Sequence, residues 1–133
     1  MSLDRRFLIW ALGYATIGIA LGIYMAASQN HGEFVTHAHI LLIGFVLSFV
    51  YGIIHKLWLD NTGRAIANIQ FAVHQAAALT ISVGLFLLYG NIVPAPTLDP
   101  ILGIASAGVL LGVLLMLYMV VRSGQARVIP GIR

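Results

Sequence analysis

Residues 36–58 read THAHILLIGFVLSFVYGIIHKLW and form a long apolar run. A helix of about twenty apolar residues spans the roughly 30 Å of hydrocarbon in a bilayer, so this stretch predicts a membrane-crossing helix. Three of the five histidines of the chain, His37, His39 and His55, lie inside it. An ionisable side chain in hydrocarbon costs about 2.5 kcal/mol or more, so residues of this kind usually mark a functional site. The histidines are therefore the first site candidates.

On an ideal α-helix, with about 100° between neighbouring residues, polar and small residues of this stretch fall on one side. The predicted stripe consists of His37, Gly44, Ser48 and His55. His39 lies about 200° from His37, so the two imidazoles leave the helix in nearly opposite directions. One helix can then serve two sites or two neighbours. Gly44 and Ser48 are small enough for a flat cofactor or another helix to approach the backbone.

The composition is that of an integral membrane protein. Of the 133 residues, 60% are hydrophobic and 8% are charged, whereas soluble domains average about 25% charged residues. Hydropathy separates four apolar runs joined by short connections. The runs are residues 7–27, 36–58, 66–90 and 101–121. We expect an all-α, integral membrane four-helix bundle in which residues 1–133 form a single domain.

Two compositional features exclude classes of function. The chain has no cysteine, which excludes disulfides, iron–sulfur clusters, thiolate zinc sites and covalent attachment of haem. Any haem must therefore be held without a covalent bond to the protein. The basic residues lie beside the apolar runs and form no cluster with aromatic residues, so we expect no nucleic-acid partner.

The positive charges predict how the helices are oriented. In a four-span arrangement every lysine and arginine falls on one side: Arg5, Arg6, Lys56, Arg64, Arg122, Arg127 and Arg133. The positive-inside rule then places both termini in the cytoplasm, in a multi-pass protein of a bacterial-type inner (plasma) membrane. His37 and His39 are expected near the outer surface, His55 near the inner surface, and His74 in the inner half of the third helix.

Local signals predict how the helices pack and connect. Gly18 and Gly22 form a GxxxG pair, which is suited to close helix packing. Asn61 or Thr62 is expected to cap the third helix after a polar turn. Residues 91–100 contain three prolines and no basic residue, which predicts a stiff loop before the fourth helix.

The histidine positions suggest where a haem could bind. Two axial imidazoles reach the iron from opposite faces, so they must lie at a similar membrane depth. His39 and His74 are separated by on the order of 10 Å along the membrane normal at 1.5 Å per residue. His37 or His39 can instead pair at equal depth with its copy in a symmetry-related subunit. An outer haem between protomers fits best, and an inner haem between His55 and His74 stays open.

Each histidine also has a structural interpretation. His31 lies in a polar loop and is expected to be solvated. His55 adjoins Lys56 and Trp58, where amphipathic side chains commonly sit at the membrane surface. His74 can form a hydrogen bond across helices, with Ser48 or Thr80 as partner. This interpretation is weakest for His37 and His39, because two buried donors need two partners.

The segment HAHILLIGFVLSFVYGIIH, residues 37–55, resembles the histidine-bearing helix of subunit I in the haem-copper oxidase superfamily, notably its cbb3-type and nitric-oxide-reductase branch. The chain more closely resembles a group of short four-helix membrane proteins often labelled cytochrome-oxidase-like. In that group a similar HAH segment is followed by a segment like QFAVHQ, residues 70–75. The likeness to the short group covers most of the chain, and the likeness to the large oxidases covers one helix.

The resemblance implies a haem site. Subunit I of those oxidases has twelve helices in three four-helix arcs, so a homotrimer of this chain is implied to imitate that body. Haem b would then lie between protomers, held by His37 and His39. The oxidases' adjacent copper-binding histidine pair has no counterpart except His74. The resemblance therefore favours a protein with haem alone or a single metal over an oxygen-reducing enzyme.

We accordingly expect a haem b protein for electron transfer or for redox or gas sensing, without catalytic residues. Gly44 and Ser48 would give room for the macrocycle. The expected partners are further copies of the chain, membrane lipid, and a quinone or a respiratory protein. One alternative is a membrane protein or transporter that binds copper or another metal through His37, His39, His74 and His55. A further alternative is a structural or assembly factor of a respiratory oxidase.

Overall fold

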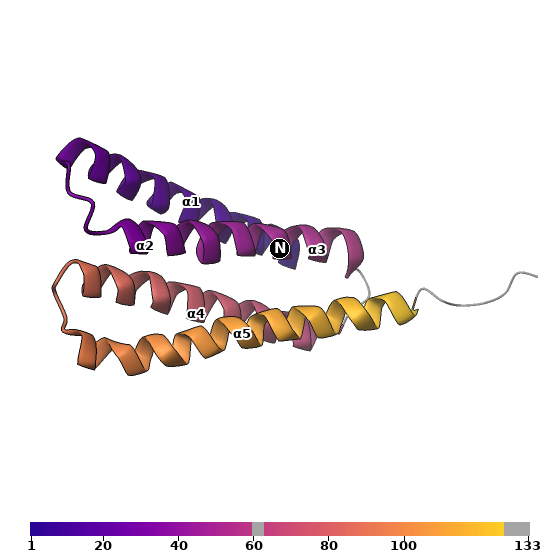
Figure 1. The fold of residues 1–133 in the computed structure, drawn as a ribbon. Coiled ribbons are helices and arrows are strands. Elements are labelled where there is room, and N and C mark those ends of the chain that lie inside the picture. Colours follow the sequence, from indigo (N-terminus) through magenta and orange to yellow (C-terminus); the bar gives the residue numbers. More distant parts are fainter. Residues whose placement is uncertain (60–62, 127–133) are drawn as a thin grey trace, which may run out of the picture.

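The computed structural model describes residues 1–59 and 63–126, and in this part of the chain every regular element is a helix (Figure 1). The elements are α1 (Leu3–Ser28), α2 (Phe34–His39), the π-helix η1 (Ile40–Leu47), α3 (Ser48–Trp58), α4 (Arg64–Tyr89) and α5 (Ala95–Ala126). Helices α2, η1 and α3 follow one another without a break, so four long helices result. All four are long and apolar enough to cross a membrane, which confirms the predicted four spans.

The four helices form two antiparallel hairpins (Figure 1). Helix α1 packs along η1 and α3, helix α4 packs along α5, and the hairpins meet where α2 and η1 contact α4. The turns within the two hairpins lie at one end of the bundle, whereas the start of α1 and the end of α5 lie at the other. We call the latter the basic end, because it carries Arg5, Arg6, Lys56, Arg64 and Arg122. Arg127 and Arg133 lie outside the described residues.

The fourth helix starts earlier than predicted. Helix α5 begins at Ala95, so the stiff loop expected over residues 91–100 is confined to its first few residues. Proline suits the first turn of a helix, because the N–H groups there have no intrahelical partner. Pro96 lies in that turn, and Pro100 lies inside the helix and costs it one hydrogen bond. The predicted caps of α4, Asn61 and Thr62, lie outside the described residues.

The π-helix η1 interrupts the α-helical geometry of the second span. A π turn closes through an i→i+5 hydrogen bond and holds one residue more than an α turn, so the residues after it are rotated about the axis. The residues of the predicted stripe still lie toward the inside of the bundle, since Gly44, Ser48 and His55 are buried and His37 is half-buried. Gly44 packs against Tyr14 of α1, whereas Ser48 contacts His74 of α4, so the stripe meets two neighbouring helices.

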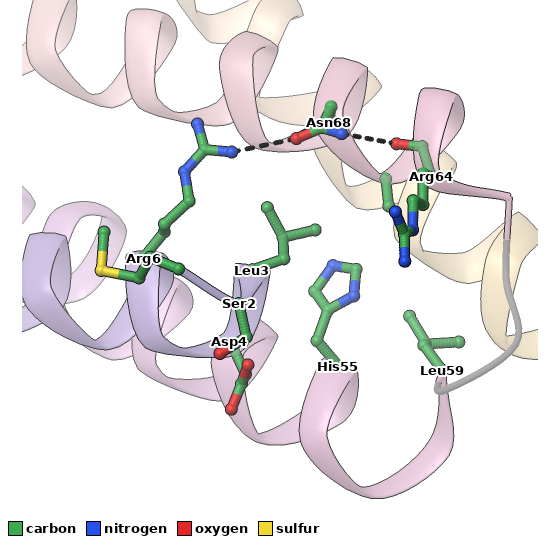
Figure 2. A pocket seen from close by; sticks show the side chains of 10 residues that line it. Ser2, Leu3, Asp4, Arg6, His55, Leu59, Arg64 and Asn68 are labelled. Atoms are coloured by element: carbon green, nitrogen blue, oxygen red, sulfur yellow. Dashed lines mark hydrogen bonds between the residues drawn. The ribbon is translucent and has the colours of Figure 1, made fainter.

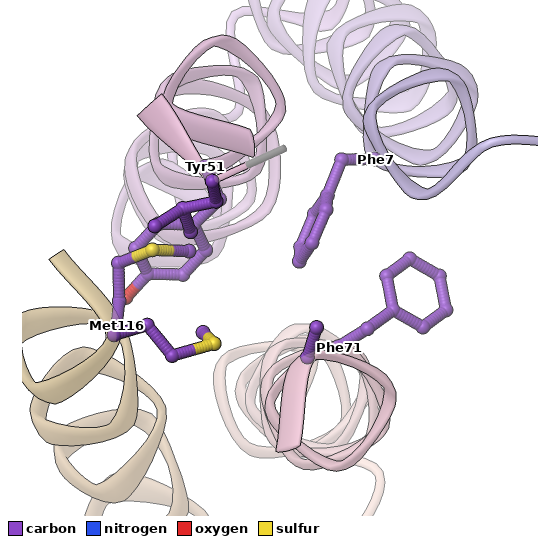
Figure 3. Packing of buried hydrophobic residues seen from close by; sticks show 7 residues of the cluster. Phe7, Tyr51, Phe71 and Met116 are labelled. Atoms are coloured by element: carbon purple, nitrogen blue, oxygen red, sulfur yellow. The ribbon is translucent and has the colours of Figure 1, made fainter. Parts of the chain in front are cut away.

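The largest hydrophobic cluster lies toward the basic end of the bundle. Figure 3 shows side chains of all four long helices meeting there, with Phe7, Tyr51, Phe71 and Met116 converging. Phe7 is fully buried, and Met119 of α5 is 1% exposed. Met116 of the same helix is buried as well. This cluster lies against His55 and His74, so it limits the space beside their rings.

Candidate functional site

His37 is held by helix α1. Its Nδ1–H donates a hydrogen bond of 2.8 Å to the carbonyl oxygen of Gly18. A Cβ placed on Gly22 would lie 2.8 Å from His37 Cε1, so only glycine leaves room for the ring at that position. The Gly18 and Gly22 pair therefore receives an imidazole as well as bringing two helices together. The side chain is half-buried.

His39 is held by its own helix. Its Nδ1–H donates to the carbonyl oxygen of Val35 at 2.8 Å, and the side chain is half-buried like that of His37. A carbonyl oxygen only accepts, so the proton of a neutral ring sits on Nδ1 and the lone pair on Nε2. Within residues 1–59 and 63–126 no hydrogen bond engages Nε2 of either ring. We call His37 and His39 the outer pair.

An acidic residue supports the helix start that carries the outer pair. Glu33 is 9% exposed, and the hydroxyl of Thr36 donates to its carboxylate at 2.5 Å. The backbone N–H of His37 donates to the Glu33 carbonyl oxygen at 2.9 Å. Glu33 is not among the site residues predicted from the sequence. Its place directly before an apolar run was the signal that it belongs to the helix start.

His74 takes part in a hydrogen-bond network between helices. It is fully buried, and its Nε2 lies 3.0 Å from the hydroxyl oxygen of Ser48. The side-chain amide of Gln75 donates to the same oxygen at 3.2 Å. The Ser48 hydroxyl is then free to donate to His74 Nε2. Thr80, the other partner considered from sequence, instead bonds the Ala76 carbonyl of its own helix.

His55 lies in the aromatic cluster near the basic end. It is 7% exposed and stacks on Phe7 with the ring centroids 5.4 Å apart. We call His55 and His74 the inner pair. Phe7 also lies 6.3 Å from the His74 ring, so a phenyl ring fills the space beside both imidazoles. Ser48 engages His74 Nε2, and Phe7 lies against both rings, so the packing inside one protomer leaves no space for a haem between His55 and His74.

The two small residues expected beside a haem serve packing inside the protomer. A Cβ on Gly44 would lie 2.5 Å from ring atoms of Tyr14, so the room at Gly44 is taken by that aromatic ring. Ser48 is fully buried and is used by His74 and Gln75. Inside one protomer, Gly44 and Ser48 therefore leave no open space for a macrocycle. His31 is exposed in the first connection, as predicted.

The candidate metal ligands do not converge inside one chain. Among the residues that the structure describes, no three histidine, cysteine, aspartate or glutamate side chains are grouped closely enough to hold a metal ion. His37 and His39 lie on one turn near the end of the bundle opposite the basic end, whereas His55 and His74 are buried toward the basic end. A metal that uses the outer pair needs further ligands from another chain.

The fold and the histidine placement define a class, namely multi-pass helical membrane proteins of four spans with histidines at two depths. Comparisons with protein-family models, with curated proteins and with solved structures gave no match. The resemblance to subunit I of the haem-copper oxidases therefore stays a prediction from the sequence.

Proposed function

We propose that this chain is a haem b-binding membrane protein for electron transfer or for redox or gas sensing, with the outer pair as axial ligands. One observation carries the proposal: Nδ1–H of both His37 and His39 is tied to a backbone carbonyl, which leaves Nε2 as the free ligand atom. Histidines that bind metals almost always hold their other ring nitrogen in this way. The basic end then faces the cytoplasm of a bacterial-type inner membrane.

The haem lies between protomers of a homo-oligomer in this proposal. Axial imidazoles approach the iron from opposite faces, whereas His37 and His39 stand on one turn of one helix. The inner pair is engaged by Phe7 and Ser48 and supplies no second ligand at the outer end. A second copy of the chain supplies it, and closed symmetric homo-oligomers are the common kind. A homotrimer also agrees with the resemblance to a twelve-helix body.

When bound, a haem b with two imidazole ligands supplies one-electron exchange without an open coordination position. The residues of this chain set the ligand geometry. The Gly18 carbonyl fixes the His37 ring from a neighbouring helix, and the Val35 carbonyl fixes the His39 ring from within the same helix. Both bonds orient the rings and raise the basicity of Nε2. A quinone or a respiratory protein is the proposed electron partner.

Two other functions compete with this proposal. Copper or another metal could be bound by histidines of several copies around a symmetry axis, and such a site would use the same free Nε2 atoms. A structural or assembly role would use histidines to join helices. The bond between Ser48 and His74 supports that role for the inner pair, but the half-buried outer pair makes no bond of this kind to another side chain within the described residues.

Absorption spectroscopy and elemental analysis of the purified protein test the proposal. After expression with ample haem and copper, we expect a b-type α band on reduction with dithionite. One haem at each interface of a closed homotrimer corresponds to one haem per chain. Copper without that band supports the metal-binding alternative. A colourless protein free of transition metals would overturn both and leave the structural role.

A further inference from the structure

A cavity of about 460 Å³ opens at the basic end of the bundle (Figure 2). The start of α1, the end of α3 and the start of α4 form its walls. Small-molecule sites in proteins commonly have volumes of about 300–1,000 Å³, so the cavity has the size of a headgroup or a small ligand. It lies at the ends of membrane-crossing helices, which is the depth of lipid headgroups.

Two arginines line this cavity from different helices. Arg6 donates a hydrogen bond of 2.9 Å to the side-chain oxygen of Asn68 and lies 4.2 Å above the ring of Phe71. Asn68 in turn donates to the backbone carbonyl of Arg64 at 2.8 Å. These contacts hold Arg6 in place, and its guanidinium keeps further N–H donors for a ligand. The side chain of Arg64 is exposed at the cavity.

His55 adds a buried polar atom to the same cavity. Its side chain is 7% exposed, and its Nε2 has no hydrogen-bond partner within the described part of the chain. A buried polar group without a partner costs free energy, so such a group calls for an explanation. Figure 2 shows the ring on the same side of the cavity as the Arg64 guanidinium. His55 is therefore available to a ligand that lies beside Arg64.

The charges favour an anionic ligand. Among the described side chains that line the cavity there are two guanidinium groups, of Arg6 and Arg64, and one carboxylate, of Asp4. Figure 2 shows the Asp4 carboxylate on the side away from Arg64. Guanidinium groups match phosphate oxygens in charge and geometry. Basic pockets between membrane helices on the cytoplasmic side commonly bind anionic headgroups.

We propose that this cavity binds the phosphate group of an anionic phospholipid. Arg64 and Arg6 contact the phosphate oxygens, and His55 offers Nε2 to the headgroup. Leu3 and Ala67 supply apolar wall beside these polar groups, which suits the glycerol part of a lipid better than a free anion. The site is separate from the outer pair, so it stands whether or not the chain binds haem.

Lipid titration of the full chain in a neutral detergent, followed by native mass spectrometry, tests this site. We expect phosphatidylglycerol to bind at least about tenfold more tightly than phosphatidylcholine, because the two lipids share the phosphate and the positive charge of choline is repelled by Arg6 and Arg64. Arg64→Gln should lower the affinity for phosphatidylglycerol by about tenfold. The matched control is Arg122→Gln, an exposed arginine at the same end that bonds the Tyr118 hydroxyl and does not line the cavity.

The other outcomes decide against the proposal. Equal affinity for the two lipids would overturn it. An equal loss in Arg122→Gln would show diffuse attraction to surface charge instead of a site. Full competition by glycerol 3-phosphate at the lipid's own concentration would identify a site for free phosphate esters. If Arg64→Gln loses helicity, His55→Phe is the second test, because it keeps a ring beside Phe7 and removes Nε2; unchanged lipid affinity there would also overturn the assignment.

Discussion

The outer and inner histidine pairs differ in what holds their rings. The outer pair is fixed by backbone carbonyls through Nδ1 and is half-buried at the surface of the bundle. The inner pair lies inside the bundle, where His74 bonds Ser48 and His55 stacks on Phe7. A backbone carbonyl leaves Nε2 free, whereas a side-chain partner uses it. The free Nε2 atoms of the outer pair support the proposed ligand role, whereas the bond between His74 and Ser48 joins two helices.

Removing one outer ligand should have the largest effect. We predict that His39→Ala loses most of its haem, with haem affinity lower by more than about tenfold, because the free Nε2 of His39 is lost and His37 is held toward α1 by the Gly18 carbonyl. Haem per chain is measured by pyridine haemochrome spectroscopy. The control is His31→Ala, which alters an exposed loop histidine and should keep its haem. Equal haem content in the two variants would contradict the assignment of His39 as a haem ligand.

The next effect concerns η1, the segment between the two pairs. In Gly44→Ala the new Cβ would lie 2.5 Å from the Tyr14 ring, so α1 and η1 must move apart. We expect the free energy of unfolding to fall by about 1–3 kcal/mol, as for other overpacked positions. Denaturation in mixed micelles, followed by circular dichroism, measures it. Gly13→Ala is the matched control, since a Cβ there meets open space and should stabilise α1 by about 0.5–1 kcal/mol.

If the two glycine variants are equally stable, the ring of Tyr14 does not fill the space at Gly44. That space would then be available to a cofactor, as the sequence first suggested. Haem content distinguishes the packing role of Gly44 from a cofactor role. If Gly44 serves packing, Gly44→Ala lowers the free energy of unfolding while the folded protein keeps its haem.

A smaller effect is expected for the bond that joins the inner pair to η1 and α3. Ser48→Ala removes the partner of His74 and Gln75. Hydrogen bonds between membrane helices contribute about 0.6 kcal/mol on average, so we expect a loss of about 1 kcal/mol of unfolding free energy. Ser106→Ala is the control, because that exposed hydroxyl bonds its own helix. Loss of haem in Ser48→Ala would place the haem beside the inner pair and contradict the proposal.

The sequence was sufficient for the four spans and for the end that carries the positive charges. Both follow from properties that accumulate over about twenty residues, so local errors average out. The predicted helix boundaries were less accurate. Helix α5 starts at Ala95 because its prolines lie where a helix start tolerates them, and the loop signal of residues 91–100 concealed this.

The site was predicted only in part, since its geometry depends on contacts between helices. The bond between His74 and Ser48 was among the partners considered, but the π turns of η1 were not predicted from any local signal. Gly44 and Ser48 contact different neighbours, Tyr14 of α1 and His74 of α4, and these contacts depend on how the helices pack. The use of Gly18 and Gly22 to hold His37 likewise follows from the position of α1 relative to α2, which the sequence alone does not specify.

The smallest predicted effect tests whether the inner half is a site of its own. The Tyr51 hydroxyl is buried without a hydrogen-bond partner in residues 1–59 and 63–126, and its ring meets the His74 ring edge-on at 4.9 Å. If the inner half only joins helices, Tyr51→Phe removes a desolvated hydroxyl and should change the unfolding free energy by no more than about 0.5 kcal/mol, or raise it. Tyr118→Phe, at an exposed hydroxyl that accepts from Arg122, is the control. A loss of more than about 1 kcal/mol in Tyr51→Phe alone would mean that the hydroxyl binds something in the membrane-embedded protein, and the purely structural role of the space around His74 would fail.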